Sequence, residues 1–242
     1  MMLCPRVART GNLDMLKYVH EAGADLDDIE YKFDDCTCAV AAGMGNMDML
    51  LYAHQNGCAW SMFTCRNAAE GGYLDVVKWL HENGCPWDSS VCAKAADKGH
   101  LDILKYAHEH GCPWDESTCK EAAEKGRLEM LKYAHENGCP WDKNVCERAA
   151  WFGHFQVLHY AHENGCPWED DTCSSAACRA NFESLKYAYE HGCPWEEELI
   201  DEAARSWLPR DEDGLDVEER KCRGYVLKVA AERGCHVVDQ LE

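Results

Sequence analysis

The chain has 242 residues, 46% of them hydrophobic, and its 24 Lys and Arg against 44 Asp and Glu give a formal net charge of −20. This length and composition predict one or two globular domains with an apolar core, and they exclude a disordered or fibrous protein. The acidic excess argues against binding to nucleic acid or to an anionic membrane, because both need clustered Lys and Arg. The 17 cysteines are the feature that needs explaining.

The sequence carries no recognisable targeting segment. No apolar run approaches the roughly 18 to 20 residues of a membrane span. The first residues, Met1 to Arg9, lack the apolar stretch of a secretory signal. We therefore expect a cytoplasmic or nuclear protein, and in such reducing compartments a disulfide framework is rare. The cysteines must then have another role.

An internal repeat of 27 residues accounts for most of the cysteines. Two columns recur at this spacing. The first comprises Cys38, Cys65, Cys92, Cys119, Cys146 and Cys173. The second comprises Cys58, Cys85, Cys112, Cys139, Cys166 and Cys193. With Cys4 and Cys235 added across longer spacings, the columns hold 14 of the 17 cysteines and leave out Cys36, Cys178 and Cys222.

The repeated unit is clearest at residues 88–114, where the pattern predicts two short helices. Asp88 is a suitable N-cap, because its carboxylate can accept amide hydrogens of the first turn. Gly99 and Gly111 are placed to end the two helices in the left-handed conformation, and Pro113 prevents continuation into the next unit. One such helix pair cannot bury its apolar face alone, so successive units must stack.

Aromatic side chains form two further columns. We expect both to pack between repeats, since large aromatic rings dominate the burial available to short units. The turn column comprises Trp60, Trp87, Trp114, Trp141, Trp168 and Trp195, and the column on the second helix comprises Tyr18, Tyr52, Trp79, Tyr106, Tyr133, Tyr160 and Tyr187. If the turn tryptophans are buried, replacing an interior one by Ala should destabilise the protein by about 3–5 kcal/mol.

The first and last units depart from the period. We expect one domain over 1–242, with a divergent first repeat at 1–33, interior repeats at 34–195 and a C-terminal repeat at 196–242. Seven residues are inserted around Ile29 to Asp35, and 15 acidic-rich residues are inserted near Trp207 to Gly214. Asp216 and Glu219 then form a capping box that starts a longer final helix.

Three segments carry a resemblance to the ankyrin repeat family. Residues Gly99-His100-Leu101-Asp102-Ile103-Leu104-Lys105 resemble the second ankyrin helix, Ala122-Ala123-Glu124-Lys125-Gly126 the end of the first helix, and Gly23-Ala24-Asp25-Leu26-Asp27 the ankyrin turn. The likeness covers roughly 4–206 and 223–238. It implies an all-α, ankyrin-like helix-turn-helix solenoid of about eight repeats. It also implies a protein that binds other proteins on the surface made by the turns and first helices.

The repeats differ from the usual ankyrin pattern in three respects. They lack the Thr-Pro-Leu-His start of the first helix, they are about six residues shorter than the usual 33, and Cys-Pro-Trp-Asp replaces the usual turn ending. The missing residues are those of the β-hairpin finger, so only the first unit has room for one. The short unit resembles ankyrin-like repeats of giant DNA viruses and of some algae and oomycetes.

The repeated Cys and His side chains suggest an alternative function as a metal-binding or redox-responsive protein. His81, Cys85 and Cys92, with their copies, place three metal-ligating side chains in every unit. Zinc prefers four ligands at short spacings such as C-x2-C, which are missing. We therefore interpret Cys as a small buried hydrophobe and His as hydrogen-bonded to a turn carbonyl. No metal ligand and no cofactor is assigned.

An enzyme is disfavoured by the same repetition. A catalytic site normally needs one nucleophile, one base and one orienting group. A Cys and His pair in every unit does not have this character, and no phosphate-binding glycine loop or Ser-His-Asp arrangement is present. We predict a non-enzymatic protein, a monomer, with no catalytic residue assigned.

The functional surface is expected where the repeats differ from one another. Trp151 and Phe152 place two large aromatic side chains in columns of the first helix that are otherwise polar, which is typical of binding hot spots. The alternative is local packing against Phe155. Our candidate partner-binding residues are Trp151, Phe152, Arg148, Glu147, Lys120, Glu121, Lys125 and Arg179. A basic patch on the partner protein would suit the acidic chain.

Overall fold

The computed structural model describes residues 3–24, 35–207 and 215–235. These residues form sixteen α-helices and no β-strand, so the all-α prediction of about eight helix pairs is confirmed. The helices are α1 (Leu3–Ala8), α2 (Leu13–Ala24), α3 (Asp35–Gly43), α4 (Met47–Gln55), α5 (Met62–Gly71), α6 (Leu74–Glu82), α7 (Ser89–Lys98), α8 (Leu101–Glu109), α9 (Glu116–Glu124), α10 (Leu128–Glu136), α11 (Asn144–Phe152), α12 (Phe155–Glu163), α13 (Asp170–Cys178), α14 (Phe182–Glu190), α15 (Glu197–Trp207) and α16 (Val217–Arg233). None of them has the length and apolarity that a membrane crossing requires.

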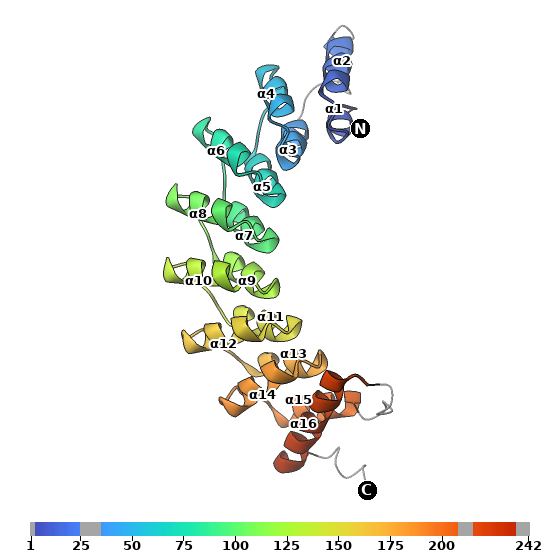
Figure 1. Ribbon diagram of the computed structural model, residues 1–242, viewed down its shortest axis with the longest axis vertical. Helices are drawn as coiled ribbons and strands as arrows, with labels where there is room; N and C mark the ends of the chain where they lie inside the picture. Colours follow the sequence, from blue (N-terminus) through green and yellow to red (C-terminus); the bar gives the residue numbers. More distant parts are fainter. Residues whose placement is uncertain (1–2, 25–34, 208–214, 236–242) are drawn as a thin grey trace. The chain divides into compact units, whose positions relative to one another are not determined.

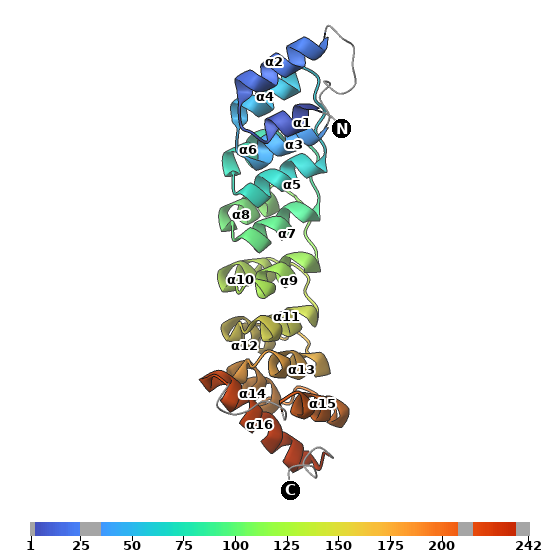
Figure 2. The ribbon, with the colours of Figure 1, turned by 90° about the vertical axis from the view of Figure 1, so that its right-hand side faces the viewer.

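The chain divides into two compact units, Met1–Thr118 and Cys119–Glu242. In the first unit, α3 packs between α1 and α5, and α5 packs on α7, so the first helices of successive pairs form one layer (Figures 1 and 2). In the second unit, α13 packs between α11 and α15, while α14 contacts α12 and α16. The hairpin finger and most of the insertion around Ile29 to Asp35, like the insertion at 208–214, lie outside the described residues.

The predicted caps begin and end the helices. Asp88 accepts a hydrogen bond from the amide of Ser90 at 3.0 Å, and Gly99 ends α7 with φ of 90°. Asp216 and Glu219 form the predicted capping box at the start of α16. The backbone signals of the sequence therefore locate most helix ends.

The apolar face of the second helix forms the core of each repeat. Ile103, Leu104 and Ala107 of α8 are all 0% exposed. Small residues form the buried face of the first helix, where Cys92 and Ala95 are also 0% exposed. Small side chains allow first helices of neighbouring repeats to approach closely, which is how short units bury a continuous core.

The turn cysteines link the end of each repeat to its beginning. The turn cysteine, which follows the second helix, donates a hydrogen bond from its thiol to a backbone carbonyl just before the first helix of the same repeat. Sγ of Cys112 lies 3.3 Å from the Asp88 oxygen, and Sγ of Cys193 lies 3.2 Å from that of Glu169. The cysteine on the first helix contacts the turn cysteine of the same repeat. The pKa of Cys65 is raised, first by its hydrogen bond to the Cys85 thiol and then by burial.

The histidines of the apolar face stack on the turn tryptophans. The His81 and Trp87 rings lie 4.0 Å apart at an angle of 12°. Nδ1 of His81 lies 3.1 Å from the hydroxyl of Tyr106 in the next repeat. The expected turn carbonyl is the partner of His54, whose Nδ1 lies 3.4 Å from the Cys58 oxygen. A long aromatic partner in the next repeat therefore replaces the local carbonyl.

The turn tryptophans are less buried than the sequence suggested. Trp60, Trp87, Trp114, Trp141 and Trp168 are only partly buried, and Trp195 alone of the column is buried, at 4% exposure. Each of the five covers its histidine with one ring face and leaves part of the ring to solvent. The stability loss predicted for a fully buried ring therefore applies to Trp195 and not to the other five.

A second contact joins successive repeats at the opposite end of the helices. In three repeats, the residue just before the second helix reaches back to a carbonyl at or just after the C-terminal end of the first helix of the preceding repeat. Nδ2 of Asn46 donates to the Gly11 oxygen at 3.3 Å. Asn181 donates to the oxygens of Ala150 and Trp151 at 2.7 and 3.0 Å. Carbonyls at helix C-termini lack the regular helical donor partner, and these side chains of the next repeat add a donor to them.

Candidate protein-binding surface

The predicted partner-binding residues all belong to the second unit, on or just after α9, on α11 and just after α13. Each helix buries its cysteine and alanines, Cys146 and Ala149 on α11 for example, against neighbouring first helices. The residues between these small ones are left partly or fully exposed. The helix period therefore places the variable columns on one accessible strip, and side-chain identity decides what the strip can bind.

Trp151 and Arg179 form the central contact of this strip. The Arg179 guanidinium carbon lies 4.2 Å from the centroid of the Trp151 ring, which is a cation–π contact. Trp151 is partly buried and Arg179 is exposed. Asn181 fixes the backbone beneath them through its bond to the Trp151 oxygen. The structure thus brings together two predicted residues that are 28 positions apart.

Phe152 extends the aromatic surface outward. It is 42% exposed, and its ring lies 6.5 Å from that of His154 in a stacked orientation. The Phe155 ring instead contacts His159 and Tyr187, at 5.8 and 5.6 Å. No ring contact joins Phe155 to Trp151 or Phe152 within the described part of the chain. The ring contacts of Phe155 are thus with His159 and Tyr187.

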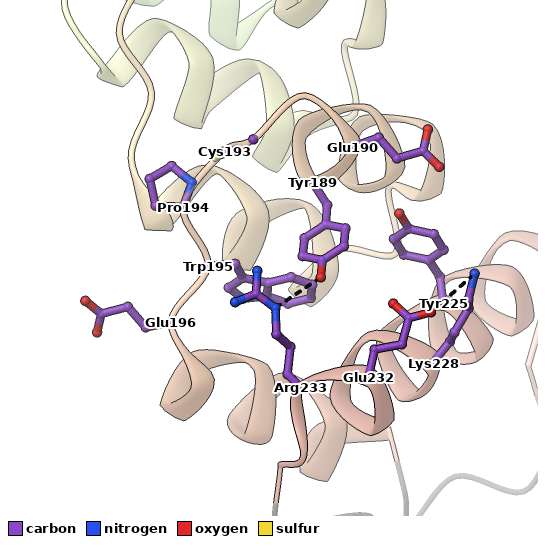
Figure 3. A pocket seen from close by; sticks show the side chains of 11 residues that line it. Tyr189, Glu190, Cys193, Pro194, Trp195, Glu196, Tyr225, Lys228, Glu232 and Arg233 are labelled. Atoms are coloured by element: carbon purple, nitrogen blue, oxygen red, sulfur yellow. Dashed lines mark hydrogen bonds and ion pairs between the residues drawn. The ribbon is translucent and has the colours of Figure 1, made fainter.

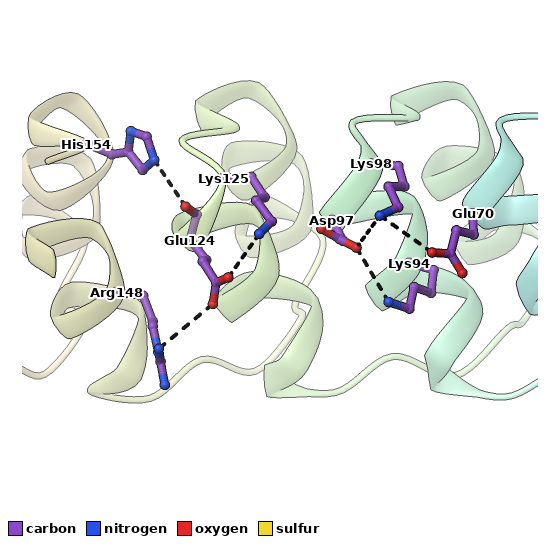
Figure 4. A network of polar contacts seen from close by, with 8 residues as sticks. All are labelled: Glu70, Lys94, Asp97, Lys98, Glu124, Lys125, Arg148 and His154. Atoms are coloured by element: carbon purple, nitrogen blue, oxygen red, sulfur yellow. Dashed lines mark hydrogen bonds and ion pairs between the residues drawn. The ribbon is translucent and has the colours of Figure 1, made fainter. Parts of the chain in front are cut away.

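Figure 4 shows a network of charged side chains on the same first helices. Glu124 is their centre: its carboxylate lies 3.0 Å from Nζ of Lys125 and 3.9 Å from Nη1 of Arg148. Nε2 of His154 lies 3.1 Å from the Glu124 backbone oxygen. Both ion pairs are accessible to solvent, so they contribute little to stability. They bring Lys125 and Arg148 together at Glu124.

The other predicted residues stand apart from this cluster. Lys120, Glu121 and Glu147 are partly buried on the same helices. No side-chain hydrogen bond or ion pair joins them to the cluster among the residues that the structure describes. Of the eight predicted residues, Trp151 and Arg179 touch each other, and Arg148 and Lys125 share Glu124.

Sequence reasoning missed two members of the cluster, Glu124 and His154. Glu124 belongs to the same variable column as Trp151 and could have been included for that reason. His154 belongs to the column that precedes each second helix, with Asn46 and Asn181. Its role depends on how far one repeat is displaced along the next, which spacing in the sequence does not specify.

A separate cleft of about 690 Å³ lies beside α14 and α16 (Figure 3). Tyr189 occupies the column position of His162, 27 residues later, and meets Trp195 edge-on at 6.1 Å instead of stacking on it. Nε of Arg233 donates to the Tyr189 hydroxyl at 3.3 Å. Burial raises the pKa of Tyr225, on the far wall, to about 12. The cleft thus lies where a tyrosine takes the place of the stacked histidine.

Metal binding by the Cys and His columns finds no support in this geometry. No group of three or more His, Cys, Asp or Glu side chains able to hold a metal ion occurs within 3–24, 35–207 and 215–235. The repeated His side chains are engaged by rings, as His162 is by Trp168 at 3.7 Å. The turn thiols face carbonyl oxygens, which are hydrogen-bond acceptors for a protonated thiol.

Comparison with known proteins agrees with the fold. Residues 119–162 match the family described as "Ankyrin repeats (many copies)". The crystal structure of the human ASB11 ankyrin repeat domain is similar, with a TM-score of 0.56, 18% sequence identity, and coverage of 65% of this chain and 84% of that one. No curated protein sequence matches the chain. Residues 119–162 are therefore ankyrin repeats, and the chain has the fold of an ankyrin repeat domain.

Proposed function

We propose that the protein is a non-enzymatic scaffold that binds a partner protein on the first helices of its second unit, around Trp151 and Phe152. The observation that carries the proposal is the exposed Phe152 next to Trp151, in columns that are polar in neighbouring repeats. Large aromatic side chains at an accessible surface supply most binding energy in protein interfaces. Ankyrin repeats, which the chain contains, typically bind protein partners.

The surroundings of the aromatic pair suit such an interface. The Arg179 guanidinium packs on the Trp151 ring, and a side chain that is already in contact loses less conformational freedom on binding. Lys125, Glu124 and Arg148 supply the polar rim that surrounds an apolar centre in protein interfaces. The chain's charge of −20 favours a partner with a basic surface, which long-range attraction would bring in. A reducing compartment, cytoplasmic or nuclear, suits 17 free cysteines.

The test compares proteins captured from the source cell by three forms of the full chain: wild type, Trp151→Ala with Phe152→Ala, and Val217→Ala. Val217 is 64% exposed at the start of α16, so its replacement removes exposed apolar surface elsewhere. We expect specific proteins to be lost with the double variant and retained with Val217→Ala, at unchanged melting temperature. Identical sets from all three forms would refute the proposed surface.

An identified partner permits a quantitative measurement by titration calorimetry. Truncating hot-spot residues costs about 2 kcal/mol or more, so the double variant should bind about 30-fold more weakly. Arg179→Lys keeps the charge but loses the planar contact with Trp151, and should weaken binding by a smaller factor. A double variant that binds like wild type would place the interface elsewhere.

A further inference from the structure

A small groove on the first helices of the first unit combines positive charge with apolar surface. Its volume is about 210 Å³, and it is lined by Arg9, Cys36, Ala39, Val40, Phe63, Arg66 and Asn67. These residues come from the end of α1, from α3 and from α5, which pack side by side (Figure 1). The lining includes two arginines and no carboxylate, in a chain whose acidic residues outnumber its basic ones by 20.

The apolar part of the groove is specific to this repeat. Phe63 is 48% exposed on α5, and its neighbour Met62 is 44% exposed. At 27-residue intervals, the positions corresponding to Phe63 are Ser90, Ser117 and Asn144. A large exposed ring in a column that is otherwise polar has no role in the repeat itself, and such surface marks an interaction site.

The two arginines have no acidic partner among the described residues. The Arg66 guanidinium lies 4.8 Å from the Phe63 ring and donates one long hydrogen bond, 3.5 Å, to Oδ1 of Asn67, while its buried Nε has no acceptor. Arg9 is exposed. Asn67 also donates to the Ala39 oxygen at 3.3 Å and so joins α5 to α3 at the floor of the groove. Arginine placed in this way pairs well with a carboxylate.

From this combination we infer that the groove binds an acidic peptide segment of a partner protein, with carboxylates toward Arg9 and Arg66 and a large apolar side chain against Phe63. The volume is below the roughly 300 Å³ at which small-molecule pockets begin, and suits a single side chain. Two arginines are too few for a nucleic acid site, which needs a row of phosphate contacts. This surface lies in the first unit and is separate from the aromatic pair of the second.

The test uses three pools of ten-residue synthetic peptides: Glu alternating with Leu, Phe or Trp; the same pool with Lys for Glu; and the same pool with Ser for the apolar residues. Cys36 lines the groove and is exposed, whereas Cys178 is exposed elsewhere, so alkylation by iodoacetamide with mass spectrometry reports occupancy with an internal control. We expect only the acidic-apolar pool to slow alkylation of Cys36, with no effect on Cys178. Inorganic phosphate is a fourth probe and should give no protection.

Binding of a labelled acidic-apolar pool, measured by fluorescence anisotropy, should weaken at least tenfold in Arg9→Gln with Arg66→Gln, and also in Phe63→Ser. Lys78→Gln, which removes a positive charge from exposed α6, should leave it unchanged, as should Trp151→Ala with Phe152→Ala. Equal binding of the Lys or Ser pool, protection by phosphate alone, or unchanged binding in the arginine variant would overturn the inference. The comparison of pools needs no variant and stands if one fails to fold.

Discussion

At the scale of single residues, Ala180 occupies a backbone conformation that the other repeats give to glycine. Its φ is 59°, and the equivalent Gly153 has φ of 75°. A side chain in this left-handed region is strained, and glycine removes the strain. We predict that Ala180→Gly stabilises the protein by about 0.5–1 kcal/mol, measured as a higher urea midpoint.

The reverse change at Gly153 serves as the control for this prediction. A Cβ atom there would lie 2.6 Å from Oδ1 of Asn181, the residue that donates to the Ala150 and Trp151 carbonyls. Gly153→Ala should therefore destabilise by about 1 kcal/mol or more. Equal midpoints for wild type and Ala180→Gly would show that the strain at Ala180 is relieved in some other way.

The tryptophans of the turn column differ in burial and should differ in their contribution to stability. Trp141 is partly buried and stacks on His135 at 3.7 Å, whereas Trp195 is 4% exposed. We predict a loss of about 1–2 kcal/mol for Trp141→Ala, from half a ring buried plus one stacking contact. Trp195→Ala should cost about 3–5 kcal/mol. Urea denaturation of both variants tests the order, and a larger loss at Trp141 would contradict it.

At the scale of helices, two histidine positions make stability depend on pH. Burial lowers the pKa of His81 and His162, and the charges of His110 and His191 lower it further. A histidine with a lowered pKa stays neutral in the folded protein while the unfolded chain takes up a proton below a pH of about 6.5. Its stabilising effect is therefore present above that pH and is lost as pH falls. Melting temperatures measured from neutral to acidic pH should decrease accordingly.

The residues at the ends of the second helices permit a matched test of this pH effect. His110 and His191 are the C-cap residues of α8 and α14, where Asn83 and Asn164 cap α6 and α12. The double change His110→Asn and His191→Asn should make the melting temperature fall less steeply with acid. Asn164→His should make it fall more steeply. Unchanged slopes in both would assign the pH dependence to other groups.

Helix boundaries and the buried faces could be predicted from sequence because they depend on local signals. Asp88, Gly99 and the 3.6-residue period of α8 act within one repeat. The aromatic pair at 151 and 152 was recognisable because it departs from its own columns. The contacts of Arg179 with Trp151 and of His154 with Glu124 were not, since they depend on how one repeat is displaced along the next. The groove at Arg9 and Phe63 also lies across the irregular spacing of the first repeat.

For the whole molecule, the distribution of thiols predicts how the chain reacts with alkylating agents. Among the 17 free cysteines only Cys36 and Cys178 are exposed, and burial and Glu202 raise the pKa of Cys178. Cys222, the third cysteine outside both columns, is buried with a pKa of about 12. Because the thiolate is the reactive form, Cys36 should be modified first and Cys178 more slowly.

Mass spectrometry after timed alkylation should find two modified thiols in the native protein and 17 after denaturation. Addition of a chelator should leave the melting temperature unchanged, in keeping with thiols that serve packing. A chelator-dependent melting temperature, or rapid modification of the column cysteines, would instead support the metal-binding or redox-responsive alternative.

The backward hydrogen bonds between repeats give the chain a polarity with respect to its synthesis. Asn46 donates to Gly11, which follows α1, and Asn181 donates to Ala150 and Trp151 in the last turn of α11, so each acceptor is made 30 to 35 residues before its donor. A ribosome would therefore release these acceptor carbonyls before the side chains that donate to them. Shortening the gene from its 3′ end would remove a donor side chain and leave its acceptor carbonyl exposed. Shortening it from the 5′ end would remove the acceptor carbonyl instead.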